Sequence, residues 1–266
     1  PVRVDPAGHT AADVGDEPLM MAAQVPVIVS RERVEGAALA RAQGATVALL
    51  DDGFQNPALI KDASLIVIDA ARGIGNGCVF PAGPLRAPLP PQIARTDALI
   101  VIGAGKAADG IATSARTSGA SVLRARLVPD QASLDQLRGQ RVLAFAGIGD
   151  PARFFATLRS SGVDVIEERI FADHHPFTPD EIGRLASAAA AKSLTLVTTE
   201  KDMARIRSDV RLQKYADKIS AFAVTLAFDD EAGRHGRAPV SSDRYASTMA
   251  DVAAAGENRD RASSAA

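Results

Sequence analysis

Short apolar runs that alternate with helical patterns constrain this chain more than any other feature of its sequence. Four such runs occupy residues 25–30, 46–51, 64–69 and 98–103. Each run is brief, rich in β-branched residues and almost continuously apolar, as are strands that a parallel sheet buries on both faces. Residues 31–44 lie between the first two runs, carry apolar residues at helical spacing and end at Gly44. Strand, helix and strand at this spacing predict a βαβ unit.

A second α/β series follows residues 121–129, whose polar and apolar positions alternate as in a half-exposed strand. Its expected strands are residues 141–147, 163–170, 194–199 and 219–228, and its expected helices are residues 151–162 and 178–192. The sequence therefore predicts an α/β fold with mostly parallel sheets in two lobes, residues 1–118 and 131–228. Residues 119–130 are the expected linker, and the polar residues 229–266 are an expected flexible tail.

Composition and charge exclude several classes of function. The net charge of −2 shows no basic excess, and aromatic content is 4% with no Trp, so nucleic acid is not an expected partner. No stretch reaches the roughly 18 apolar residues that a membrane-spanning helix needs. The single cysteine, Cys78, allows no internal disulfide and is typical of a reducing compartment. The chain begins at Pro1 without the pattern of a signal peptide, which we interpret as a fragment or a processed product.

Polar clusters follow five of the expected strands, at the ends where open parallel sheets bind ligands. The clusters are Asp51 with Asp52, Asp69 with Arg72, and residues 147–150, 171–177 and 198–202. One carboxylate at a strand end is commonly a solvated cap, but five such ends together favour a site. Adjacent strand residues face opposite sides, so Asp51 and Asp52 need not collide. In phosphoryl transfer, one such carboxylate can orient the attacking hydroxyl while others hold magnesium.

The histidine pair at His174 and His175 has two interpretations. A histidine near a strand end is commonly a surface or packing residue, but Asp173 precedes this pair and could orient one ring as an acid or base. A metal site is not expected, because Cys78 and the remaining histidines show no ligand spacing.

The stretch GAGKA at residues 103–107 lies between a strand and a helix, like a phosphate-binding loop. The template GxxxxGK[ST] requires a glycine where Ile100 stands and a hydroxyl where Ala107 stands. We therefore reject this stretch as a phosphate loop.

The stretch GIGDPA at residues 147–152 matches the loose dinucleotide-binding template, with Ala152 in the last place. It keeps one alternative open, a nucleotide-dependent α/β oxidoreductase. That template also needs an acidic residue at the end of the next strand, whereas Glu167 and Glu168 lie inside it. The stretch can equally be a tight turn whose amides face a cleft.

Six motifs stand in order along the chain: VDPAGHTAADVGDEPLMMA, LLDDGFQNP, FPAGPLRAP, AGIGDPARFFATL, FADHHPFT and TTEKDMARI. From Val4 to at least Arg205, the chain thereby resembles the tetraacyldisaccharide 4'-kinase family. The resemblance implies a P-loop kinase of two α/β/α lobes joined by a β-stranded linker. It also implies transfer of the γ-phosphate of ATP to the 4'-hydroxyl of a lipid-linked glucosamine disaccharide in lipid A biosynthesis. The expected place of this reaction is the cytoplasmic face of the inner membrane of Gram-negative bacteria, where the protein binds peripherally.

The resemblance implies roles for individual residues. Asp51 corresponds to the catalytic aspartate of the family, His174 to the histidine that pairs with it, and Asp52 to a residue that supports the same site. Asp16 and Glu17 match an acidic pair that is associated with Mg²⁺.

Arg86, in the GPLR motif, is expected to face phosphate. Glu200, Lys201 and Asp202 match a motif in the cleft, where the first two are expected to bind ATP. The chain departs from the family at Asn56, where many members have His, because Asn can hydrogen-bond a sugar but cannot titrate.

The Walker A loop of the family lies N-terminal to the region where this chain begins. We therefore expect the 266 residues alone to bind ATP poorly and to be inactive. This expectation keeps a second alternative open, a non-catalytic homologue that binds the acylated sugar without phosphorylating it.

Overall fold

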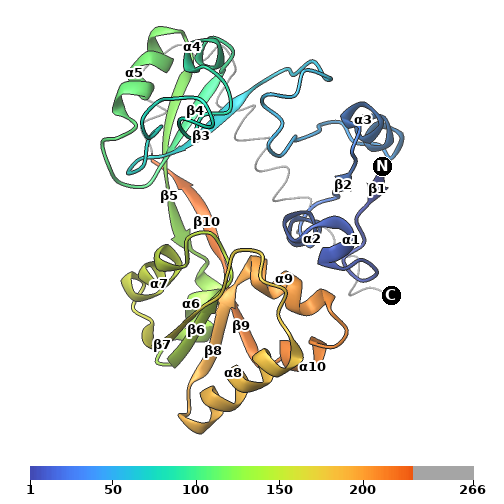
Figure 1. Cartoon of the computed structure of the whole chain (residues 1–266), viewed down its shortest axis with the longest axis vertical. Helices are drawn as coiled ribbons and strands as arrows, with labels where there is room; N and C mark the ends of the chain where they lie inside the picture. The colour runs from blue at the N-terminus through green and yellow to red at the C-terminus, as the bar shows by residue number, and fades with distance from the viewer. Residues whose placement is uncertain (230–266) are drawn as a thin grey trace. The chain divides into compact units, whose positions relative to one another are not determined.

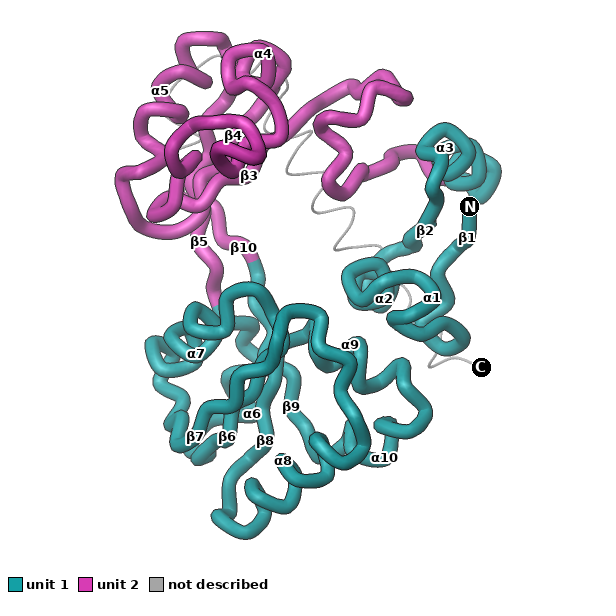
Figure 2. The backbone as a smooth tube through the Cα atoms, viewed as in Figure 1, with its two compact units in different colours: residues 1–44, 129–225, 255–266 teal, residues 45–128, 226–254 magenta. Residues whose placement is uncertain are grey.

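Two four-stranded sheets organise residues 1–229, the part of the chain that the computed structural model describes (Figure 1). The residues form two units, which Figure 2 colours separately. Unit 1 contains Pro1–Gly44 and Pro129–Thr225, and unit 2 contains Ala45–Val128 and residues 226–229. The predicted lobes were contiguous in sequence, whereas unit 1 joins the first 44 residues to the second α/β series. Nearly all of the predicted tail lies outside the described residues.

The sheet of unit 1 is parallel throughout, with the strand order β7-β6-β8-β9. Its strands are β6 (Arg141–Ala146), β7 (Asp164–Ile170), β8 (Thr195–Thr199) and β9 (Ile219–Phe222). Its helices are α6 (Gln131–Leu137), α7 (Pro151–Ser160), α8 (Pro179–Ala191), α9 (Glu200–Ser208) and α10 (Gln213–Ala216). Because the strands are parallel, the turns that follow β6, β7 and β8 lie at one edge of the sheet.

The core of unit 1 is built on the two faces of β6. Val142 and Ala144 are fully buried and belong to the cluster that contains Phe155 of α7. Leu143 and Phe145 are also fully buried, and they belong to the cluster formed with α8 and α9. Alternate residues of a strand point to opposite faces, so this division places α7 on one side of the sheet and α8 and α9 on the other. The expected α/β/α layering is confirmed in this unit.

Helix α8 begins where its sequence signals predict, whereas the start of α9 was not predicted. Thr178 is the N-cap of α8 and forms the expected capping box with Glu181, and Pro179 occupies the first turn. Thr199 is the N-cap of α9 and accepts a hydrogen bond from the Asp202 N–H at 3.1 Å. Helix α9 therefore starts directly at the end of β8, which carries its first turn to the edge of the sheet.

The N-terminal segment of unit 1 differs from its prediction. It contains α1 (Ala11–Val14), α2 (Asp16–Ala22), α3 (Arg33–Ala42) and a two-stranded antiparallel ribbon of β1 (Val2–Arg3) and β2 (Ile28–Val29). The expected helix at residues 31–44 is confirmed as α3. Helix α2 packs against α9, and this contact joins the segment to the rest of unit 1.

The predicted βαβ unit over residues 25–51 is wrong. Only Ile28–Val29 of its first strand is extended, and it pairs antiparallel with β1. The second expected strand, residues 46–51, forms no strand, and its side chains Val47 and Leu49 are 59% and 65% exposed. An apolar run becomes a strand only where a neighbour completes its backbone hydrogen bonds, and local pattern does not report that neighbour.

The sheet ordered β10-β5-β4-β3 belongs mainly to unit 2, although Pro129 of β5 and the first two residues of β10 belong to unit 1. Its strands are β3 (Leu65–Asp69), β4 (Ala98–Ile102), β5 (Ser121–Pro129) and β10 (Val224–Phe228), and its helices are α4 (Leu89–Ile93) and α5 (Asp109–Thr117). Strands β3, β4 and β5 are parallel, and β4 is the buried centre against α5. The single strand expected at residues 219–228 is instead two strands, β9 and β10, which belong to different sheets.

The longest described helix, α8, has 13 residues. Within residues 1–229, no helix combines the length and the apolar character that crossing a membrane requires.

Candidate functional site

The turns after β6, β7 and β8 converge on Gly147. Its N–H donates to Asp202 Oδ2 at 3.0 Å, and its carbonyl accepts from the His174 N–H at 3.1 Å and from Arg205 Nη1 at 2.9 Å. A Cβ at this position would lie 3.2 Å from the Ala172 carbonyl oxygen and equally close to Asp202 Oδ1. Glycine therefore lets the three turns approach one another at a single backbone unit.

Asp202 is a fully buried carboxylate at the base of this edge. Its Oδ2 accepts the Thr199 hydroxyl at 2.8 Å as well as the Gly147 N–H, and its Oδ1 accepts Arg205 Nη1 at 2.6 Å. A buried charge is retained only where such partners replace water. The aspartate of the TTEKD motif is thus a structural centre of the three turns.

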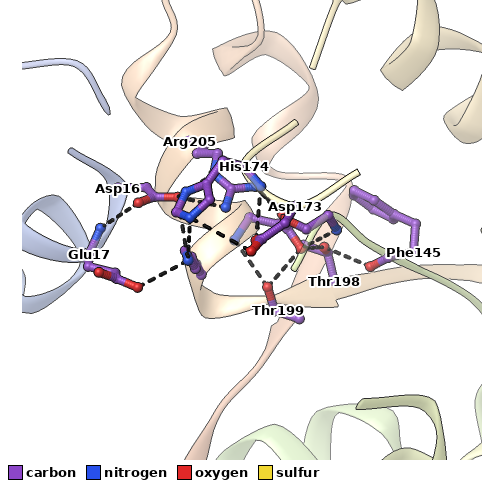
Figure 3. Close-up of polar contacts among 11 residues, drawn as sticks. Asp16, Glu17, Phe145, Asp173, His174, Thr198, Thr199 and Arg205 are labelled. Carbon is purple, nitrogen blue, oxygen red and sulfur yellow. Dashed lines mark hydrogen bonds and ion pairs between the residues drawn. The ribbon is translucent and has the colours of Figure 1, made fainter. Parts of the chain in front are cut away.

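Arg205 is also buried, with 8% of the residue exposed, and it connects Asp202 with Asp16. Figure 3 shows Arg205 beside Asp16 and His174. Its Nε donates to Asp16 Oδ2 at 2.7 Å, and its Nη2 lies 2.6 Å from the same oxygen. Asp16 is the first residue of α2 and lies 189 positions earlier in the sequence. One guanidinium therefore links the N-terminal segment to the edge of the sheet.

His174 contacts the same oxygen of Asp16. Its Nδ1 lies 2.9 Å from Asp16 Oδ2, and its Nε2 lies 3.5 Å from Lys201 Nζ and 3.8 Å from Asp173 Oδ2. An ionised carboxylate only accepts hydrogen bonds and an ammonium group only donates them. Of the two neutral tautomers of the ring, Asp16 and Lys201 therefore favour the one with its proton on Nδ1 and its lone pair on Nε2. The side chain is 57% exposed, so a ligand can reach it.

The backbone of His174 has an uncommon conformation. Its φ is +56°, and the other non-glycine residues with positive φ in the described part of the chain are Asp52 and Ser193, at +51° and +52°. The His174 N–H donates to the Gly147 carbonyl and also to Asp173 Oδ1 at 3.0 Å, which holds this conformation. Such conformations cost free energy and cluster at functional sites. Two of the residues that the resemblance assigns to catalysis share this property.

Electrostatics keep Asp16 ionised. Burial by itself raises the pKa of its carboxyl group, but the hydrogen bond and the charge of Arg205 lower it, and His174 and Lys201 add to the same effect. The net result is a pKa below the ordinary value of an aspartate. Asp16 is therefore a charged acceptor for the Nδ1–H of His174 at neutral pH.

Glu17 completes the polar group through Lys201. Lys201 Nζ donates to Glu17 Oε1 at 3.1 Å and lies 3.9 Å from Asp16 Oδ2. Glu200, by contrast, accepts a hydrogen bond from the Val224 N–H at 3.4 Å, and burial raises the pKa of its carboxyl group. Of the two residues expected to bind ATP through this motif, Lys201 is the one that the structure brings to Asp16 and His174.

The resemblance associates Asp16 and Glu17 with Mg²⁺, and their surroundings bear on that role. Magnesium binds carboxylate oxygens and water in an octahedral arrangement. Here both carboxylates have cationic partners, and within residues 1–229 no three His, Cys, Asp or Glu side chains gather as a metal site. The arrangement does not fit direct coordination of Mg²⁺ by both residues.

The remaining predicted site residues belong to unit 2. Arg86 Nη1 forms an ion pair with Asp52 at 2.6 Å, and both side chains are 62% exposed. Asp51 is exposed as well. Because Asp51 and His174 belong to different units, their pairing stays a prediction.

Sequence reasoning assigned no role to Arg205 and did not pair Asp16 with His174. The spacing of Asp202 and Arg205, three residues apart, places both on one face of α9 and could have indicated their ion pair. The contacts with Asp16 depend on the packing of α2 against α9, which has no signature in either segment.

Known proteins match this chain over most of its length. Residues 1–236 match the model of the family described as LpxK, tetraacyldisaccharide-1-P 4'-kinase. A tetraacyldisaccharide 4'-kinase of Rhodopseudomonas palustris (strain ATCC BAA-98 / CGA009) is 68% identical over 232 residues, which are 87% of this chain and 68% of that protein. One of Nitrobacter winogradskyi is 65% identical over 231 residues, with the same coverage of 87% and 68%.

A solved structure also resembles this one. It is the crystal structure of LpxK from Aquifex aeolicus in complex with ATP. The TM-score is 0.61 at 26% sequence identity, and the match covers 85% of this chain and 68% of the other.

Proposed function

The chain belongs to the tetraacyldisaccharide 4'-kinase family, and we propose that it takes part in transfer of the γ-phosphate of ATP to the 4'-hydroxyl of a tetraacylated glucosamine disaccharide. The family match over residues 1–236 and the 68% identity to a protein of that name support the reaction. The solved relative with bound ATP supports the phosphate donor. The protein is then a phosphotransferase with an alcohol acceptor in lipid A biosynthesis.

The contact between Asp16 and His174 is the observation that favours a chemical role for this edge of unit 1. The tautomer that these two contacts favour has its proton on Nδ1, toward the ionised Asp16, and its lone pair on Nε2. Nε2 can take the proton of the 4'-hydroxyl while that oxygen bonds to the γ-phosphorus and ADP leaves. The Asp16 carboxylate stabilises the imidazolium that forms, as carboxylates do behind catalytic histidines.

Lys201 is positioned to act on the same reaction. Its side chain is 18% exposed, and its Nζ lies 3.5 Å from His174 Nε2. A fixed cation beside the reacting oxygen stabilises negative charge that develops on the phosphoryl group. We therefore keep the predicted role of Lys201 toward ATP.

Mg²⁺ is expected to accompany ATP, because it neutralises charge on the β- and γ-phosphates in phosphoryl transfer. Asp16 and Glu17 are paired with Arg205 and Lys201 here, so we assign no step of the reaction to a metal held by that pair.

Asp51 remains the residue that the motif resemblance proposes for hydroxyl activation, and Asp52 follows it in the sequence. The Asp52–Arg86 ion pair supports a connection between these two residues. Asp51 and the Asp16–His174 pair are thus two proposals for the activation of the hydroxyl, and substitution can separate them.

The acylated substrate supports a place at a membrane surface. A disaccharide with four acyl chains partitions into lipid, so the protein must reach it at the bilayer. We propose peripheral binding at the cytoplasmic face of the bacterial inner membrane, where ATP is present.

The hydrogen bonds of Gly147, in the turn of residues 147–152, argue against the oxidoreductase alternative. A dinucleotide fold directs the amides of this turn at a pyrophosphate. The Gly147 N–H instead donates to Asp202, and its carbonyl accepts from Arg205 and His174.

Transfer of phosphate from ATP to a tetraacylated disaccharide tests the proposal, with the protein expressed as its gene encodes it. We compare the wild type with D16N, D51N and the control D217N, which changes an exposed aspartate outside the site. We expect D16N to lower kcat at least about 100-fold, the scale of a lost general base, and D217N to leave it within twofold. An unaffected D16N with an inactive D51N would transfer the activating role to Asp51, and lipid binding without transfer in the wild type would favour the non-catalytic alternative.

A further inference from the structure

Arg205 contacts Asp16 at the oxygen that His174 also uses. Nε and Nη2 of Arg205 lie 2.7 and 2.6 Å from Asp16 Oδ2, and Nδ1 of His174 lies 2.9 Å from it. Figure 3 shows the three side chains meeting at this point. The guanidinium of Arg205 therefore fixes the position of Asp16 Oδ2. Nδ1 of His174 lies within hydrogen-bond distance of the same oxygen.

The other end of the guanidinium is fixed by the edge of the sheet. Nη1 donates to Asp202 Oδ1 at 2.6 Å and to the Gly147 carbonyl at 2.9 Å. Asp202 is in turn held by the Gly147 N–H and the Thr199 hydroxyl. A planar guanidinium with donors on both sides transmits this fixed geometry, which a flexible ammonium cannot do.

Stability alone is a weak explanation for this buried group. Replacing buried ion pairs by apolar residues is often neutral or stabilising, because desolvation offsets the Coulomb attraction. Stability therefore does not explain why a charged arginine is kept at 8% exposure. Its contact with the Asp16 oxygen that His174 also contacts offers a functional explanation.

We propose that Arg205 is a positioning residue, which holds the Asp16 carboxylate so that Oδ2 accepts the Nδ1–H of His174. Arg205 acts through Asp16 and does not itself meet the substrate. This inference extends the proposed function, on which its kinetic consequence rests. Its structural consequence, the hydrogen-bonded Nδ1–H of His174, is independent of any activity.

The structural consequence is tested by NMR of protein labelled with ¹⁵N-histidine, in which H174Q identifies the His174 signals. We compare the wild type with R205Q, R205K and R207Q, where Arg207 is an exposed arginine of the same helix. We expect the Nδ1–H signal of His174 to disappear or exchange rapidly in R205Q. In R205K it should weaken, because lysine lacks the planar arrangement of several N–H donors that a guanidinium has. It should be unchanged in R207Q.

The kinetic consequence is tested with the same variants. We expect kcat to fall about tenfold in R205K and about 100-fold in R205Q, with KM for both substrates within twofold, because misplacement of a catalytic group acts on the transition state. In the D16N background, R205Q should lower kcat less than twofold further, since the residue acts through Asp16.

The inference is overturned if R205K and R205Q keep the Nδ1–H signal and kcat while only the melting temperature falls, which is the result of a merely structural role. If R205Q does not fold, R205K decides by the same criteria. A wild type that lacks kinase activity contradicts the proposed function, and the NMR comparison still decides the role of Arg205.

Discussion

Nδ1 of His174 lies 2.9 Å from Oδ2 of Asp16, although 158 positions separate the two residues in the sequence. The contact joins the turn after β7 to the first turn of α2, and both belong to unit 1. It pairs an ionised carboxylate with an exposed imidazole, which is an arrangement suited to moving a proton.

Lys201 should affect ATP more than the disaccharide. We expect K201M to raise KM for ATP about tenfold, the scale of one charge-assisted hydrogen bond, and to change KM for the disaccharide less than twofold. K218M, which removes an exposed lysine after α10, serves as the control. Steady-state kinetics with each substrate varied in turn provide the measurement, and a larger effect on the disaccharide would place Lys201 on the acceptor side.

Gly147 should not tolerate a side chain. A Cβ there would lie 3.2 Å from the Ala172 carbonyl oxygen and from Asp202 Oδ1, whereas a Cβ at Gly110 of α5 would meet nothing within 4 Å. We expect G147A to lower the free energy of unfolding by about 1–3 kcal/mol, as overpacking does. G110A should be neutral or stabilising by up to about 1 kcal/mol, because alanine favours a helix. Urea unfolding measures both, and equal stability of the two variants would contradict the close approach at Gly147.

Glu181 should stabilise α8 in a pH-dependent way. Hydrogen bonds from the Thr178 N–H, then from His175 and the Thr178 hydroxyl, lower the pKa of its carboxyl group to about 2. Because the folded state lowers the pKa, the stabilisation is complete above the ordinary value of 4.5 and is lost as pH falls from there through about 2. We expect E181Q to cost about 1 kcal/mol at pH 7, typical of a lost cap, and much less near pH 2.

The control for this prediction is D180N, which changes an exposed acidic residue in the same turn of α8. Urea unfolding at pH 7 and at pH 2–3 gives the comparison. A destabilisation by E181Q that is the same at both pH values would show that packing, and not the ionised cap, supplies the stability.

The sequence predicted much of the second α/β series, because the expected strands at residues 141–147 and 163–170 are each followed by a helix start signal, at Pro151 and Thr178. The expected strand at residues 219–228 was wrong, because it is two strands in different sheets. The capping box at Thr178 is an example of a signal that is complete within four residues. Parallel strands end at one edge, so the meeting of residues 147, 174 and 202 also followed from the predicted topology.

Prediction failed where the outcome depended on distant partners. Residues 46–51 have the composition of a strand, but no strand forms there, because composition does not specify a pairing neighbour. The contact between Arg205 and Asp16 was not predicted for the same reason. The two residues are 189 positions apart and meet only because α2 packs against α9. The motif resemblance assigned Asp16 to a metal and His174 to Asp51, and neither assignment could be derived from local pattern.

A double-mutant cycle in kcat between Asp16 and His174 tests the central claim most directly. The protein as its gene encodes it is assayed for phosphate transfer to the tetraacylated disaccharide as wild type, D16N, H174Q and the double variant. If the two side chains act as one unit, each single change lowers kcat about 100-fold and the double change lowers it hardly further. If the two losses multiply, or if either single variant keeps full kcat, the pair does not carry the proton transfer and the account is contradicted.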